Sequence, residues 1–189
     1  MTTALLGGAF DPPHLGHVEL ARAALDRFRP DDLVVLVAAA PGHRQVVADP
    51  EVRLRLARAA FPDLRVDLDG HARTVDLLRE RRFDDPLFLI GADEFADFLS
   101  WKEPDQVLEL ARMGVAARPG YPRERLDPVL ARLRHPERVE LFQIEPHPVA
   151  SRELRARVAD DRPIDGLVPP EVAELVRKLG LYRRVAERG

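Results

Sequence analysis

With 189 residues, the chain is long enough to fold as one domain with a sizeable core, and 46% hydrophobic with 32% charged residues is typical of a globular protein. The absence of cysteine excludes disulfide scaffolds, thiolate metal sites and cysteine nucleophiles, and it favours a cytoplasmic protein. The net charge of −3 argues against a nucleic-acid partner, and the lack of a signal peptide or of an apolar run near the roughly 20 residues of a membrane span argues against a membrane.

Short apolar runs alternate along the chain with longer segments of helical periodicity. We expect strands at 4–6, 33–37, 64–66, 87–90, 113–117 and 139–144. We expect helices at 18–28, 52–61, around 75–78, and at 106–111 and 126–133. The alternation predicts an α/β fold, a Rossmann-like doubly wound parallel sheet with helices on both faces.

The last part of the chain, from about 145 to 189, has a different character. It opens with a Glu-Pro-His-Pro run, which suits neither a central strand nor the interior of a helix. Helices are then expected over 151–158 and 169–178, with Gly180 ending the second. We therefore expect a single domain over 1–189 with a helical C-terminal extension.

One segment lies between the first strand and the first helix, where an open parallel sheet places its ligands. Gly7 and Gly8 leave the backbone free to approach a phosphate. His14 and His17 are three residues apart in the first helical turn, so both imidazoles lie on one face near the positive helix end, where anions bind. Two simpler interpretations stay open: the glycines form only a turn, or the histidines bind zinc, although no third ligand has the spacing of a zinc motif.

The complete segment Gly-Gly-Ala-Phe-Asp-Pro-Pro-His-Leu-Gly-His at 7–17 resembles the signature of the nucleotidylyltransferase superfamily. Further fragments resemble, in the expected order, the nicotinate-mononucleotide adenylyltransferases of that superfamily. These fragments lie at 41–44, 70–78, 90–93, 101, 117–121, 149–155, 167–172 and 180–182. The order of the fragments is far more specific than any one of them.

The resemblance implies an enzyme of NAD biosynthesis that joins nicotinate mononucleotide to the AMP moiety of ATP and releases pyrophosphate. It implies His14, His17 and Arg155 as catalytic residues. It implies ATP binding by Gly7, Gly8, Ala9, Phe10, His14, His17, Asp93, Ser151 and Arg155, the last two in a second ATP-phosphate motif within the C-terminal extension. Mg²⁺ is expected to bind through the ATP phosphates, with few or no protein ligands.

For the acceptor nucleotide, the resemblance implies that Trp101 stacks on the pyridine ring, that Thr74 binds its nicotinate end, and that Arg44 and Arg118 meet phosphate. Each has a simpler alternative, because Trp101 is also suited to a core and either arginine to a solvated surface. Asp93 is expected to accept hydrogen bonds from the adenosine ribose, or else to cap the helix that follows it.

Several residues depart from the family pattern. Ala9 and Ala150 replace hydroxyl residues, Arg152 replaces a threonine, and Arg73 replaces a tyrosine beside Thr74. These departures leave two alternatives open: the same chemistry on nicotinamide mononucleotide or another phosphorylated acceptor, and a nucleotide-binding protein that has lost turnover. Whether the protein forms a homo-oligomer is also left open.

Overall fold

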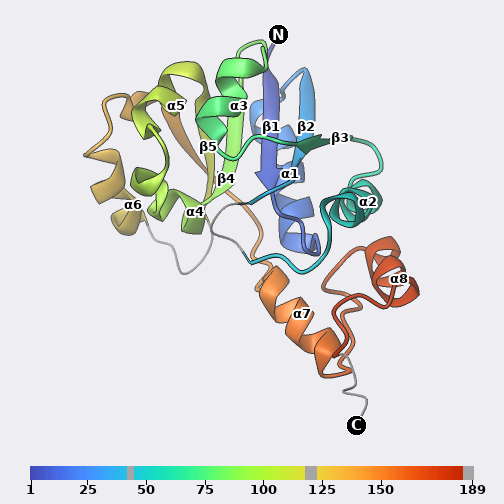
Figure 1. Ribbon diagram of the computed structural model, residues 1–189. Helices are drawn as coiled ribbons and strands as arrows, with labels where there is room; N and C mark the ends of the chain where they lie inside the picture. Colours follow the sequence, from blue (N-terminus) through green and yellow to red (C-terminus); the bar gives the residue numbers. More distant parts are fainter. Residues whose placement is uncertain (42–44, 118–122, 185–189) are drawn as a thin grey trace.

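A computed structural model describes residues 1–41, 45–117 and 123–184 (Figure 1). Its centre is a six-stranded, fully parallel sheet in the order β3-β2-β1-β4-β5-β6. The strands are β1 (Thr3–Gly8), β2 (Asp32–Ala38), β3 (Arg65–Asp69), β4 (Leu87–Gly91), β5 (Arg112–Ala117) and β6 (Val139–Gln143). All six expected strands are therefore confirmed, with boundaries that differ by a few residues.

Eight α-helices belong to the described residues. They are α1 (Leu15–Phe28), α2 (Pro50–Ala60), α3 (Thr74–Glu80), α4 (Ala92–Ala96), α5 (Pro104–Leu110), α6 (Arg123–Leu130), α7 (Ser151–Ala159) and α8 (Pro170–Lys178). Proline occupies the first position of α2, α5 and α8, where a missing N–H costs no hydrogen bond. In the described segments, no helix is both long and apolar enough to cross a bilayer.

The alternation of side chains along the strands produces two apolar layers. Ala4 and Leu6 of β1 face a cluster that includes α1, α2 and α8, whereas Leu5 faces a cluster formed with α3, α4, α5 and α6. The C-terminal extension joins the first cluster through residues such as Val172 and Val176 of α8. Helices thus cover both faces of the sheet, as predicted.

Two helical expectations need correction. The short helix α4 was expected only as the helix that Asp93 would cap, whereas it begins before that residue, at Ala92, directly after β4. The helix expected at 126–133 instead ends at Leu130, and a turn follows it.

The strand order creates a switch point. From β1 the chain proceeds to β2 and β3 on one side, then returns to place β4 against the other side of β1. Loops leaving the carboxyl ends of β1 and β4 therefore diverge, and an open α/β sheet binds ligands in the crevice between them. Figure 1 shows α7 beyond this end of the sheet and α8 beside α2.

Candidate active site

A cleft of about 1180 Å³ lies at the carboxyl ends of the strands, around the switch point. It is lined from β1 and the β1–α1 loop, the starts of α3 and α4, the segment around Trp101, and α7. The cleft brings together Gly7, Gly8, Ala9, Phe10, His14, His17, Thr74, Asp93, Trp101, Ser151 and Arg155. Of the site residues expected from the sequence, only Arg44 and Arg118 lie outside the described residues.

The two glycines do not form a loop after the strand, because they are the last two residues of β1. A Cβ on Gly7 would lie 2.9 Å from Cζ of Phe88, and a Cβ on Gly8 would lie 2.9 Å from Cζ of Phe10. Both rings are buried. The glycines therefore leave room for aromatic rings beneath the cleft as well as exposing backbone along it.

The two histidines lie together at the start of α1. His14 is the N-cap residue rather than a residue of the first turn, and the two imidazole rings stack with centroids 3.7 Å apart. The backbone N–H of His14 donates to Nδ1 of His17 at 3.2 Å. Neutral His17 therefore carries its proton on Nε2, which makes that atom a hydrogen-bond donor. No acidic residue occupies the first turn of α1, so an anion bound there is not repelled by a negative side chain.

The α7 side chains reach back to the β1–α1 loop. Ser151 donates from Oγ to the carbonyl oxygen of Pro12 at 2.9 Å, and Arg155 donates from Nη1 to that of Asp11 at 2.8 Å. The N-cap of α7 is Ala150, so Ser151 does not cap the helix. These bonds place the guanidinium of Arg155 at the cleft beside the histidine-bearing loop.

Trp101 and Thr74 line the other part of the cleft. Trp101 is partly buried and packs edge-on against Phe98, with ring centroids 5.2 Å apart. The next residue, Lys102, donates to both carboxylate oxygens of Asp76 at 2.8 and 3.1 Å, in the first turn of the helix that Thr74 begins. This ion pair fastens the Trp101 segment to the start of α3.

Asp93 lies in the first turn of α4 and lines the cleft. The N-cap of that helix is Gly91, so the alternative in which Asp93 is the cap residue is wrong. A Cβ on Gly91 would lie 2.6 Å from Oδ1 of Asp93, which means that a larger residue at 91 would displace the carboxylate.

Local sequence patterns did not indicate that three residues around the cleft matter to it: Arg53, Asp11 and Tyr182. Arg53 is fully buried, and burial lowers the pKa of its guanidinium. Asp11 is 1% exposed and accepts a hydrogen bond from the hydroxyl of Tyr182, 171 positions away. Asp11 belongs to the quoted motif, but neither periodicity nor local spacing links it to Arg53 or Tyr182.

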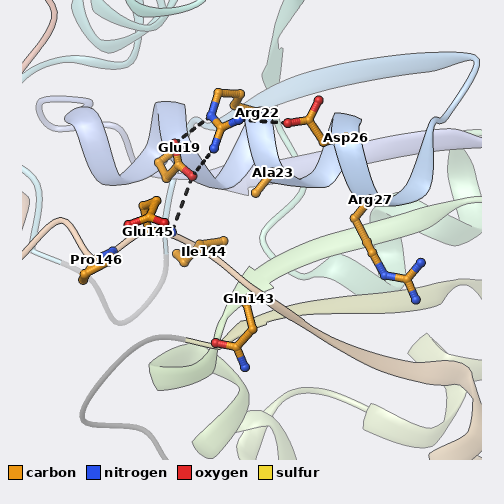
Figure 2. Close-up of a pocket in the computed structure, with 9 residues that line it drawn as sticks. All are labelled: Glu19, Arg22, Ala23, Asp26, Arg27, Gln143, Ile144, Glu145 and Pro146. Atoms are coloured by element: carbon orange, nitrogen blue, oxygen red, sulfur yellow. Dashed lines mark hydrogen bonds and ion pairs between the residues drawn. The ribbon is translucent and has the colours of Figure 1, made fainter.

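A second hollow, of about 530 Å³, lies between α1 and the segment after β6 (Figure 2). Arg22 donates to the two carboxylate oxygens of Glu19 at 2.8 and 2.9 Å and to Asp26 at 2.8 Å. The hydrogen bonds from Arg22 hold the pKa of Glu19 below its usual value. The hollow contains none of the expected site residues, and both of its arginines, Arg22 and Arg27, are paired with carboxylates.

The fold and the cleft together define a class of protein: a Rossmann-like α/β protein whose ligand cleft holds a histidine pair at the start of the helix after β1. Residues 5–157 match the cytidylyltransferase-like family. The chain is 34% identical to a Rubrobacter xylanophilus protein over 100% of the chain and 95% of that protein, and 37% identical to one from Thermus thermophilus over 97% and 100%. Both are named "Probable nicotinate-nucleotide adenylyltransferase".

The chain therefore belongs to the cytidylyltransferase-like family and, within it, to the nicotinate-nucleotide adenylyltransferases, which confirms the resemblance read from the sequence. Solved structures agree on the fold. A Plasmodium falciparum nicotinic acid mononucleotide adenylyltransferase complexed with NaAD matches with a TM-score of 0.76 and 16% identity, over 96% of this chain and 97% of that one. The same Plasmodium protein complexed with APC matches with a TM-score of 0.75 and covers 96% of both chains.

Proposed function

We propose that the cleft catalyses the joining of nicotinate mononucleotide to the AMP moiety of ATP, giving nicotinate adenine dinucleotide and pyrophosphate for NAD biosynthesis. An oxygen of the acceptor's 5′-phosphate attacks the α-phosphorus of ATP, and the bond from that phosphorus to the departing pyrophosphate breaks. The observation that carries the proposal is one cleft holding two unlike parts. His14, His17 and Arg155 line one part, and Trp101 with Thr74 lines the other.

The reaction needs no protein nucleophile, because the acceptor phosphate is already ionised near neutral pH. Catalysis then consists of holding two anions in line and stabilising the charge that builds on the transferred phosphoryl group. Nε2 of His17 is a donor for that charge, and the guanidinium of Arg155 supplies a second. One well-placed donor of this kind contributes about 3 kcal/mol to transition-state stabilisation.

Mg²⁺ is proposed to enter with ATP. In the part of the chain that the structure describes, no three His, Asp or Glu side chains form a group suited to hold a metal ion. The imidazoles and the guanidinium beside the β1–α1 loop are hydrogen-bond donors, so this part of the cleft fits phosphate oxygens better than a cation. His14, His17, Ser151 and Arg155 would orient the phosphates, and a bound Mg²⁺ would neutralise part of their charge.

The acceptor part of the cleft is proposed to bind the nicotinate ring on Trp101 and its polar end near Thr74. Arg73, which precedes Thr74 and lines the cleft, is exposed and donates only to the carbonyl of Ala72 among the hydrogen bonds described for it. Its cation is the group we assign to the acceptor's carboxylate, because Lys102 is already paired with Asp76. Arg44 and Arg118, outside the described residues, stay predictions for phosphate binding.

Two alternatives make different predictions. Action on nicotinamide mononucleotide requires no cation beside the ring, whereas Arg73 favours the acid. Lost turnover was suggested by Ala9, Ala150 and Arg152. However, the carbonyl oxygen of Ala9 accepts from Arg53 at 2.9 Å, a backbone role that needs no hydroxyl.

The test is turnover of ATP and Mg²⁺ with nicotinate mononucleotide, its amide and a third phosphorylated acceptor. We expect pyrophosphate and dinucleotide in equal amounts, with the acid as the best substrate. ATP binding without pyrophosphate release from any acceptor would contradict the proposal and support the alternative of lost turnover. Faster reaction of the amide would instead contradict the assignment of the acceptor.

A further inference from the structure

A buried carboxylate joins three parts of the chain behind the proposed ATP site. Asp11 accepts hydrogen bonds at Oδ1 from the hydroxyl of Tyr182 at 2.7 Å and from the N–H of Ala48 at 3.3 Å. Its Oδ2 accepts from the N–H of Val47 at 2.6 Å. The carboxylate therefore links the β1–α1 loop to the residues before α2 and to the segment after α8.

The same residue positions Arg155. The carbonyl oxygen of Asp11 accepts from Nη1 of Arg155 at 2.8 Å, while Oδ2 of Asp11 lies 3.7 Å from that nitrogen. Nη2 of Arg155 donates to the carbonyl of Gln45 at 3.3 Å. The guanidinium is thus held by main-chain oxygens, and the carboxylate stays at a longer distance, occupied by its own donors.

Tyr182 supplies one of those donors from the far end of the chain. It is 9% exposed and follows Gly180, whose positive φ of 61° reverses the chain after α8. Burial, followed by the neighbouring charge of Asp11, raises the pKa of the phenol, so Tyr182 remains protonated and donates. Tyr182 also lies beyond residues 5–157, the part that matches the cytidylyltransferase-like family.

We infer that Tyr182 is a positioning residue for Arg155, acting through Asp11; the inference rests on the proposed role of Arg155 at the ATP phosphates. While the hydroxyl occupies Oδ1, the Asp11 carboxylate remains turned toward Tyr182 and the 47–48 backbone. Without the hydroxyl, Oδ1 keeps only the longer bond from the N–H of Ala48, so the carboxylate is held less firmly and rotates toward Arg155, which shortens the 3.7 Å ion pair into a direct hydrogen-bonded one. That pair draws the guanidinium away from the phosphates and cancels part of its charge.

If Tyr182 only stabilised the fold, its substitution would lower stability without a specific effect on Arg155. Its ring packs in the same apolar cluster as Val176 of α8, so a loss of packing there lowers stability without acting on Arg155 in particular. The hydroxyl is the part that reaches Asp11, and Tyr182→Phe removes it while keeping the ring. Val176→Ala is the matched control, because it loosens the cluster and leaves the hydroxyl in place.

The experiment is a double-mutant cycle of Tyr182→Phe and Arg155→Ala, with kcat, KM for ATP and for the acceptor, ATP affinity by calorimetry, and Tm measured for each protein. We expect Tyr182→Phe to lower kcat/KM for ATP about tenfold, with the acceptor KM unchanged. In the Arg155→Ala background, we expect the same substitution to change neither turnover nor ATP affinity, although it still lowers Tm.

The inference is overturned if Tyr182→Phe lowers ATP affinity and kcat/KM equally in the wild-type and Arg155→Ala backgrounds. It is also overturned if Val176→Ala, at a Tm similar to that of Tyr182→Phe, shows the same loss of ATP affinity and kcat/KM. The proposed function fails separately, if wild-type protein makes no dinucleotide from any acceptor. In that event the calorimetric cycle still decides whether Tyr182 acts on ATP through Arg155. If wild-type protein binds no ATP, both are refuted.

Discussion

Arg53 in α2 donates from Nη1 to the carbonyl oxygen of Ala9 at 2.9 Å, across 44 positions of the chain. The same guanidinium donates to the carbonyls of Ala38, Ala39 and Ala48 at 2.7, 2.9 and 3.0 Å. One buried cation therefore fastens the β1–α1 loop, which leads into the histidine pair at the start of α1, to both ends of the connection between β2 and α2.

Arg53→Met should remove all four of these bonds and leave four buried or part-buried carbonyl oxygens without this donor. Because broken buried charge interactions are costly, we expect the free energy of unfolding to fall by roughly 3–5 kcal/mol. Urea unfolding measures the loss. Arg55→Met on the exposed side of the same helix is the control and should change stability by less than about 0.5 kcal/mol. A similar small change in Arg53→Met would contradict the role assigned to Arg53.

Much of the fold could be predicted from the sequence because its signals are local. The six apolar runs each mark a parallel strand, and helical periodicity marks the segments between them. The bounds of α4 could not be predicted from periodicity, since five residues directly after β4 contain little more than one turn. The C-terminal stop at Gly180 was predicted correctly, and its φ of 61° explains it.

For the candidate site, residue types and motif order predicted which side chains line one cleft, and the roles of these side chains stay predictions. The cleft gathers His14, His17, Trp101 and Arg155 from distant segments, as the resemblance implied. What could not be predicted are the contacts formed only by tertiary structure. The hydrogen bond between Asp11 and Tyr182 spans 171 positions, and nothing in the local pattern of either residue requires the other.

His71 should make stability depend on pH. Its Nδ1 lies 2.6 Å from Oδ1 of Asp69 and its Nε2 lies 3.1 Å from Oε2 of Glu80. The hydrogen bond with Asp69, then that with Glu80, raises the pKa of His71 above the ordinary value of 6.5. Since the folded state holds this proton more tightly, the stabilisation is complete below about pH 6.5 and is lost as pH rises through the folded-state pKa.

We therefore expect His71→Asn to lower the free energy of unfolding more at about pH 6 than at about pH 9, as measured by urea unfolding. In an Asp69→Asn background the difference between the two pH values should shrink, because the larger cause of the raised pKa is gone. A loss of the same size at both pH values would show that His71 contributes through packing rather than charge.

Trp101 should report acceptor binding directly, because it is the sole tryptophan of the chain. Nicotinate mononucleotide stacking on its ring should change the tryptophan fluorescence in a saturable manner. Trp101→Phe should abolish the signal and retain part of the affinity, whereas Trp101→Ala should raise the acceptor KM about tenfold or more with little effect on the KM for ATP. An unchanged acceptor KM in Trp101→Ala would place the ring elsewhere.

Arg73 should select the acid form of the acceptor. In Arg73→Gln we expect kcat/KM to fall about tenfold for nicotinate mononucleotide and to stay near its original value for the amide, since only the acid offers a carboxylate. Arg152→Gln is a matched control, because Arg152 is an exposed arginine of the same cleft in its α7 part. Equal losses on both acceptors in Arg73→Gln would refute selection by this residue.

Pyrophosphate release in His17→Ala tests most directly whether His17 supplies a hydrogen-bond donor to the transition state. Turnover should fall by about 10²-fold or more, while the free energy of unfolding changes by no more than about 1 kcal/mol. His135→Ala, outside the cleft, should leave both unchanged. If turnover in His17→Ala stays within a fewfold of wild type while stability is unchanged, His17 does not stabilise the transition state.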